Sequence, residues 1–251
     1  MVFLAIYLTR AGVGDYWDDV DRWVRNVYAE SQMLDDKFVE KIPKAYLVPG
    51  PSKKPHGDTR EIAKRSIGSF WGWMSANDAF FVDTTEPKHH LPNVSIMHCC
   101  TANGARTLYY VWDYMVRKEG DWVKVELLLN RASEWLDVAS YLPVSGKVVL
   151  SIKNAPEVAV RMPEWSEPLG VRMTIGDRTL KPVVEGRYLK ISGLKPGDQV
   201  TLMFPVPERS EHRVIGEIPY KLVLRGSNVV SIDPKGVVYP LYEDQPSGDA
   251  I

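Results

Sequence analysis

The chain has 251 residues, of which 45% are hydrophobic and 25% are charged, and its formal net charge is -1 at pH 7. A chain of this length can bury a sizeable core and corresponds to one large domain or two small ones. The balanced charge argues against a nucleic-acid partner, because such proteins carry a basic excess. No apolar run approaches the length needed to cross a bilayer, so we expect no membrane partner either.

The first residues, MVFLAIYL, are apolar and lack the basic segment and cleavage site of a signal peptide. We predict one buried helix face here. The stretch starts at full hydrophobicity without a capping residue, which suggests that an upstream packing partner is missing.

The first half of the chain has helical spacing. Apolar residues recur every three to four positions over residues 16–28, which predicts a helix with an apolar stripe. Prolines in residues 42–58 predict a long loop. A second helix is predicted over residues 102–118, and its C-terminus would carry Arg117 and Lys118. The apolar face of that helix is formed by Leu108, Val111, Trp112 and Met115.

The pattern changes at Lys118-Glu119-Gly120, after which short alternating segments are separated by turn residues. Segments of this kind lie at 123–127, 147–152, 158–162, 171–175, 188–191 and 200–204. Strands at such regular spacing predict an antiparallel β-sandwich. We therefore expect an α+β protein with a helical part over 1–119 and a β-sandwich domain over 120–251.

The two cysteines of the chain, Cys99 and Cys100, are adjacent. A disulfide between neighbours is strained, so no disulfide framework is expected and the cysteines do not decide the compartment. They immediately precede the second predicted helix, where free backbone N–H groups would stabilise a thiolate that could attack an electrophilic carbon. The alternative is a pair of buried free cysteines acting as small hydrophobes. The pair alone favours that alternative, because a zinc site needs about four ligands.

A resemblance changes this weighting. The segment at 98–110, HCCTANGARTLYY, resembles the Cys-Cys motif of glycoside hydrolase family 127, the β-L-arabinofuranosidase group once classed as a domain of unknown function. Further segments resemble blocks of that family in the same order, at 11–26, 127–143, 158–165 and 186–207. The blocks span most of the chain.

The resemblance implies the C-terminal part of an (α/α)-barrel catalytic domain followed by a β-sandwich, and a carbohydrate substrate. It implies a retaining hydrolase with a thioglycosyl intermediate, in which Cys99 is the nucleophile and both Cys99 and Cys100 contact a Zn²⁺ ion. In the family that ion is also held by a glutamate and a third cysteine, and a separate glutamate serves as general acid and base. These remaining groups lie upstream of the matched segment, and this sequence has no third cysteine. We therefore expect zinc binding and activity only when an upstream segment is supplied.

Two other functions stay open from the residues alone. The chain could be a non-catalytic carbohydrate-binding or scaffolding module, or the vicinal thiols could serve redox or metal delivery, which ring strain disfavours. Weaker site candidates are Asn77, Asp78, His89, His90, Trp71, Trp73, Arg106 and Glu30. For each of these, a turn, a solvated face, core packing or an ordinary ion pair is the commoner role. Sugar, linkage, oligomeric state and compartment are not determined.

Overall fold

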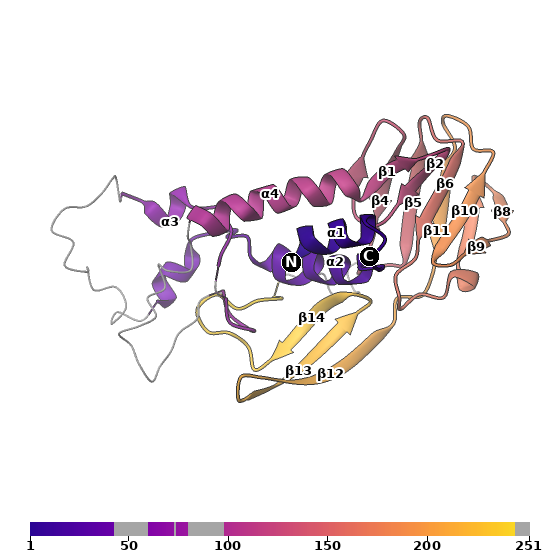
Figure 1. The fold of residues 1–251 in the computed structure, drawn as a ribbon. Coiled ribbons are helices and arrows are strands. Elements are labelled where there is room, and N and C mark those ends of the chain that lie inside the picture. Colours follow the sequence, from indigo (N-terminus) through magenta and orange to yellow (C-terminus); the bar gives the residue numbers. More distant parts are fainter. Residues whose placement is uncertain (43–59, 73, 80–97, 244–251) are drawn as a thin grey trace.

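A computed structural model describes residues 1–42, 60–72, 74–79 and 98–243 and has an α+β fold (Figure 1). The helices gather in one part of the molecule and two large sheets lie at the other end, while a third, smaller sheet lies below the helices. The predicted loop at 42–58 and residues Trp73, His89 and His90 fall almost wholly outside the described residues. Within the described part, no helix is both long and apolar enough to span a membrane.

The helical part consists of short helices and one long one, and α1 packs against α2 and α4. Their bounds are α1 Val2–Arg10, α2 Trp17–Trp23, the π-helix η1 Val24–Tyr28, the 3-10 helix η2 Lys37–Lys41, α3 Ile62–Arg65 and α4 His98–Tyr114. The expectation of a buried helix face at the N-terminus holds for Val2 and Ile6, whereas Phe3, Leu4 and Tyr7 are exposed. Successive side chains of an α-helix point to all sides of it. An uninterrupted apolar run therefore also exposes some apolar side chains to solvent.

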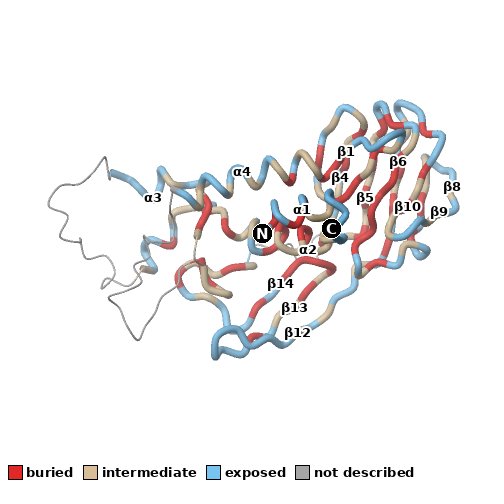
Figure 2. Tube along the Cα trace, in the orientation of Figure 1, coloured by how far each residue is buried: buried red, intermediate tan, exposed pale blue. Residues whose placement is uncertain are grey.

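Helix α4 differs from its predicted bounds at both ends. It begins at His98, before the predicted residue 102, and stops at Tyr114. Arg117 and Lys118 lie in strand β1 (Val116–Glu119), because Val116 pairs with Val125 at the start of an antiparallel ladder. Only half of the predicted apolar face is covered: Val111 and Met115 are buried, but Leu108 and Trp112 are 55% and 48% exposed. Figure 2 shows the length of α4 largely as exposed or intermediate.

The strands after α4 form two large sheets. One has the order β1-β2-β6-β10-β9 and the other β3-β4-β5-β11-β7-β8, and all pairs are antiparallel except β2 with β6. The further bounds are β2 Trp122–Val125, β3 Arg131–Ala132, β4 Leu136–Ser140, β5 Lys147–Ile152, β6 Glu157–Arg161, β7 Arg172–Ile175, β8 Arg178–Leu180, β9 Val183–Glu185, β10 Tyr188–Ser192 and β11 Gln199–Met203. A short 3-10 helix, η5, spans Pro168–Gly170.

One hydrophobic core joins both large sheets to the helices. It contains Val123 and Val160 from the first sheet, Leu150 and Leu202 from the second, and Ile6 from α1. The alternating burial along β5, in which every second residue is buried, follows from the period of two along a strand. The regular alternation is why these strands could be predicted from the sequence.

A third sheet was not predicted. It is a meander of β12 (Glu208–Ile215), β13 (Ile218–Arg225) and β14 (Asn228–Asp233), paired antiparallel. The sequence of β12, ERSEHRVI, has no clear apolar face, because most of its side chains lie exposed and need not be apolar. The proposed division of the chain at residue 119 remains a prediction; β14 contacts η1 of the helical part.

In a second, smaller core, residues near the C-terminal end of the described chain pack against the helical part. It is formed by Met33, Phe38, Trp71, Ala79, Val238 and Leu241. The Asp78 carboxylate accepts the backbone N–H groups of Val237, Val238 and Tyr239 at 2.7, 2.8 and 2.7 Å. Segments far apart in the sequence are thus joined by one buried side chain.

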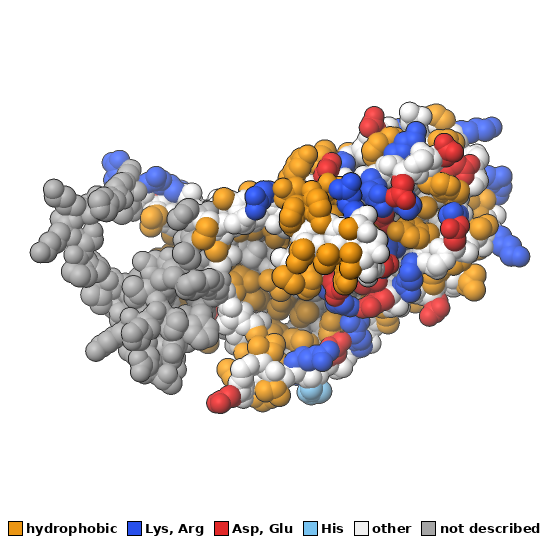
Figure 3. Space-filling view, in the orientation of Figure 1, with side chains coloured by type: hydrophobic (Ala, Val, Ile, Leu, Met, Phe, Trp, Pro, Cys, Tyr) orange, Lys and Arg blue, Asp and Glu red, His pale blue; other side chains and the backbone are white. Residues whose placement is uncertain are grey.

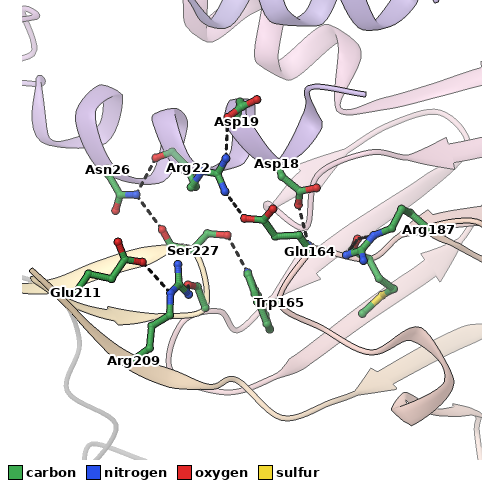
Figure 4. Close-up of polar contacts among 12 residues, drawn as sticks. Asp18, Asp19, Arg22, Asn26, Glu164, Trp165, Arg187, Arg209, Glu211 and Ser227 are labelled. Atoms are coloured by element: carbon green, nitrogen blue, oxygen red, sulfur yellow. Dashed lines mark hydrogen bonds and ion pairs between the residues drawn. The ribbon is translucent and has the colours of Figure 1, made fainter. Parts of the chain in front are cut away.

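Polar side chains connect α2 and η1 to the sheets (Figure 4). The Arg161 guanidinium of β6 donates to Asp15 at 2.8 Å and to Asp18 at 2.6 Å, and only 4% of its side chain is exposed. The Asn26 amide donates to the Ser227 carbonyl at 2.8 Å and its oxygen accepts the Val229 N–H at 2.7 Å. These contacts fix the helices against both the first large sheet and the third sheet.

Candidate functional site

The vicinal thiols lie in the first turn of α4, not before it as predicted. Cys99 is exposed and Cys100 is half-buried, and both are free. Their Sγ atoms are 3.9 Å apart. The alternative of two buried structural cysteines therefore does not describe Cys99.

Two aromatic rings pack against the part of α4 that carries the thiols. Tyr28 of η1 stacks on Phe70 with ring centroids 5.0 Å apart and an angle of 19° between the planes, and its hydroxyl donates to the Gly104 carbonyl at 2.8 Å. Burial raises the pKa of Tyr28 to about 12, so the hydroxyl remains a donor at neutral pH. The Thr101 hydroxyl donates to the Phe70 carbonyl at 3.3 Å.

Gly104 allows this close packing. A Cβ atom at that position would lie 2.4 Å from Cγ of Phe70. Glycine inside a helix costs about 1 kcal/mol relative to alanine, so its presence in the second turn has a packing reason. The sequence placed Gly104 at the helix entry; the close approach to Phe70 is the role that sequence reasoning missed.

A short polar chain runs along the exposed side of the same turns. The Asn103 amide donates to the Cys99 carbonyl at 2.8 Å, and the Arg106 guanidinium donates to the Asn103 side-chain oxygen at 2.6 Å. The spacing of four and then three residues places all three groups on one helix face. Arg106, one of the weaker candidates, is positioned in the structure by Asn103.

The two thiols differ in their electrostatic surroundings. Burial raises the pKa of the Cys100 thiol, and its contact with the Cys99 sulfur acts in the same direction. Cys99 is exposed and lies in the first turn of the helix, where backbone N–H groups have no partner within the helix. Of the pair, Cys99 is therefore the more accessible nucleophile.

The sulfur pair fits half of a zinc site. With Zn–S bonds of about 2.3 Å in a tetrahedron, two sulfur ligands lie about 3.8 Å apart. The Sγ separation of 3.9 Å matches this spacing without rearrangement. Among the described residues, no group of three or more His, Cys, Asp or Glu side chains could hold a metal ion. Cys99 and Cys100 thus supply two donors, and this part of the chain does not complete the set.

The weaker candidates have structural roles where they are described. Asp78 is buried and bonded to backbone N–H groups, and Trp71 belongs to the smaller core. Glu30 accepts the backbone N–H of Tyr242 at 2.8 Å. The Asn77 amide donates to the Pro234 carbonyl at 2.9 Å. None of these four is brought to the thiol pair by the contacts that the structure records for them.

The fold and the site together define an α+β protein with two free thiols on the first turn of its longest described helix. No protein-family model matches the chain, and no curated protein matches it. Solved structures similar in fold include a GH127 β-L-arabinofuranosidase from Geobacillus stearothermophilus T6, at 19% identity and a TM-score of 0.47. Two others are a glycoside hydrolase, at 20% and 0.49, and a GH127 β-arabinofuranosidase, at 19% and 0.48.

Each of these similarities covers 64% of this chain and 28%, 30% and 29% of the respective solved chains. The chain therefore spans less than a third of the length of the proteins that it resembles in structure.

Proposed function

We propose that the chain is part of a retaining glycoside hydrolase of the GH127 type, acting on arabinofuranosidic or related glycans, with Cys99 as its nucleophile. The observation that carries this proposal is the exposed Cys99 thiol on the first turn of α4, with the Cys100 sulfur 3.9 Å away. The sequence blocks around residues 11–26, 98–110 and 186–207 support the same assignment.

In the proposed reaction the Cys99 sulfur attacks the anomeric carbon of the sugar. A carbon–sulfur bond forms while the bond to the leaving-group oxygen breaks, and that oxygen takes a proton from a general acid. Water then attacks the same carbon, gives up a proton to the conjugate base, and releases the thiolate. Two displacements at one carbon retain its configuration.

The residues of this chain have defined parts in that scheme. The first turn of α4 presents the exposed Cys99 sulfur, and the Tyr28–Phe70 stack fixes the position of that turn. Asn103 bonds to both the Cys99 carbonyl and the Arg106 guanidinium, which places a basic side chain on the same helix face as Cys99. The general acid is proposed to come from a segment other than the described residues.

Zn²⁺ is the proposed cofactor, with Cys99 and Cys100 as two of its ligands and the others contributed from upstream. When bound, the ion would remove the thiol protons at neutral pH. The Sγ separation supports this assignment, because it equals the spacing of two ligands on one tetrahedral ion within about 0.2 Å.

We also infer that the two large sheets form a β-sandwich and that the helices belong to an (α/α)-barrel domain. The sandwich is supported by the single core to which both sheets contribute buried residues. The barrel is supported by the partly uncovered apolar faces of α1 and α4, where further helices could pack.

The proposal is tested by aryl β-L-arabinofuranoside hydrolysis with the full-length gene product, comparing wild type with Cys99→Ser. We expect the substitution to lower kcat by on the order of 10³-fold or more, as loss of a nucleophile does. Asp177→Asn, in an exposed turn of the sheet domain, is the matched control. Full activity of Cys99→Ser would show that another group is the nucleophile.

Metal analysis of the same proteins separates the enzyme from a non-catalytic module. We expect stoichiometric zinc in wild type and loss of zinc in Cys100→Ser, since removal of one ligand lowers metal affinity strongly. Wild-type protein that binds oligosaccharide but lacks zinc and hydrolytic activity would establish the carbohydrate-binding alternative instead.

A further inference from the structure

A cavity of about 670 Å³ lies where the C-terminal end of α4 meets β1 and β3, away from the thiol turn. It is lined by Trp112 and Tyr114 of α4, Arg117 and Lys118 of β1, and Arg131 of β3, with Trp135 beyond them. This volume falls within the range of small-molecule sites. In Figure 3, basic side chains lie next to the apolar patch near the end of α4.

Arg131 is the unusual group in this cavity. The residue is only 8% exposed, and its guanidinium carbon lies 3.7 Å from the centroid of the Trp112 ring. One terminal nitrogen donates to the Ala132 carbonyl. Its Nε is buried and has no hydrogen-bond partner among the described residues. A buried arginine in a folded protein is normally paired through its planar fork.

The surrounding charges do not neutralise Arg131. Burial lowers the pKa of Arg131, and Asp113 opposes this only through its more distant charge, since Arg131 forms no ion pair within the described part of the chain. Arg117, by contrast, forms an ion pair with Glu126, with 3.2 Å between its Nη2 and the carboxylate Oε1. The buried Nε is out of a ligand's reach, but an arginine without an ion-pair partner favours binding of an anion at its terminal nitrogens.

The shape and the remaining lining decide which anion fits. A carboxylate matches the arginine fork. Trp135 offers a ring surface of the kind on which sugar rings pack, whereas the Trp112 and Tyr114 rings each carry a guanidinium group, of Arg131 and Arg10, on one face. Asp113 and Glu134 also line the cavity, and they can accept hydroxyl groups while disfavouring a doubly charged phosphate.

We propose that this cavity binds a uronic acid, an acidic sugar whose carboxylate pairs with Arg131 and whose ring lies against the aromatic lining. Lys118, exposed at the edge of the cavity, attracts the anion from solution. The inference does not depend on Cys99 being catalytic, because no residue of the thiol turn lines this cavity.

The test is isothermal titration of the chain with glucuronate, glucose, acetate and inorganic phosphate. We expect glucuronate to bind at least about tenfold more tightly than glucose, which lacks the charge, and than acetate, which lacks the ring. Tryptophan fluorescence is expected to change with glucuronate, because Trp112 is stacked under Arg131 and is 48% exposed. Tighter binding of phosphate, or no binding of glucuronate, would overturn the proposal.

Variants assign the binding to this cavity. Arg131→Lys keeps the charge but removes the fork, and we expect a loss of about tenfold or more in glucuronate affinity. Lys118→Ala alters only an exposed side chain and is expected to weaken binding about twofold to fivefold, which tests the site even if Arg131→Lys unfolds. Arg213→Lys, on exposed β12, is the matched control. Unchanged affinity in Lys118→Ala and in a folded Arg131→Lys protein would refute the assignment.

Discussion

Two adjacent residues of one type have different properties because the helix turns between them. Cys99 faces solvent while Cys100 turns toward the protein, where burial raises the pKa of its thiol. The pair was identified from the sequence, but the difference between its members depends on which side of α4 is covered. The same helix packs on Phe70 at Gly104, and no local sequence pattern connects Phe70 to this helix.

The difference between the thiols predicts their reactivity. At neutral pH the single-thiol variant Cys100→Ser, which retains Cys99, should react faster with iodoacetamide than Cys99→Ser, because a raised pKa lowers the thiolate fraction of Cys100. In guanidinium chloride the two rates should converge, since the contrast comes from the fold. Equal rates in the folded proteins would contradict this account of the turn.

Asp78 illustrates the opposite outcome at the residue scale, because a candidate for sugar binding is instead a structural group. Asp78→Ala leaves three backbone N–H groups without their acceptor, so we expect a loss of about 2–4 kcal/mol in the free energy of unfolding. Urea denaturation measures this loss. The control Glu208→Ala removes an exposed ion pair with Arg225 and should cost less than about 1 kcal/mol.

Among the elements, the strands of the two large sheets could be predicted far better than α4. Strand β5 alternates buried and half-buried residues, and the sequence pattern repeats that alternation. Helix α4 has apolar residues on two sides, with Leu108 and Trp112 exposed, so its pattern overstated the buried face and misplaced both ends. Charged β12 had no pattern to detect.

Because Gly104 contacts Phe70, its replacement by alanine should destabilise the protein although alanine favours the helix. Gly104→Ala should raise intrinsic helix stability by about 1 kcal/mol, yet we expect a net loss of about 1–3 kcal/mol, because the new methyl group would overlap the Phe70 ring. Thermal unfolding measures the change. In a Phe70→Leu background, Gly104→Ala should lower the free energy of unfolding much less. If its cost is the same in both backgrounds, the Phe70 ring is not the cause of the destabilisation.

At the scale of the whole molecule, ion pairs join the helices to the first large sheet. Burial raises the pKa of Asp18, but hydrogen bonds and charge from Arg161 outweigh it and hold the pKa below its usual value. A carboxyl group with a lowered pKa in the folded state stabilises the protein above its unfolded pKa, about 3.9. That contribution is lost as the pH falls through the folded-state value.

Asp18→Asn should therefore be destabilising in a pH-dependent way. At pH 7 we expect a loss of about 1–3 kcal/mol, because the buried Arg161 guanidinium loses one of its two carboxylate partners. The difference from wild type should shrink as the pH falls below about 4. Urea unfolding at several pH values tests this, with Asp177→Asn as an exposed control. A constant difference at all pH values would exclude the ionised carboxylate as its source.

The carboxylates of Asp78 and Glu30 have a consequence for how the protein is made. Both bind the backbone of residues 237–242, which leave the ribosome long after Trp71, although Trp71 shares the smaller core with Val238 and Leu241. The two large sheets, whose last strand ends at Met203, can form before these residues are made, but the smaller core that contains Trp71 cannot. A chain that ended before residue 237 would lack part of the smaller core around Trp71. The neighbouring residue Phe70, on which the thiol-bearing turn of α4 packs, would then lose that adjacent packing.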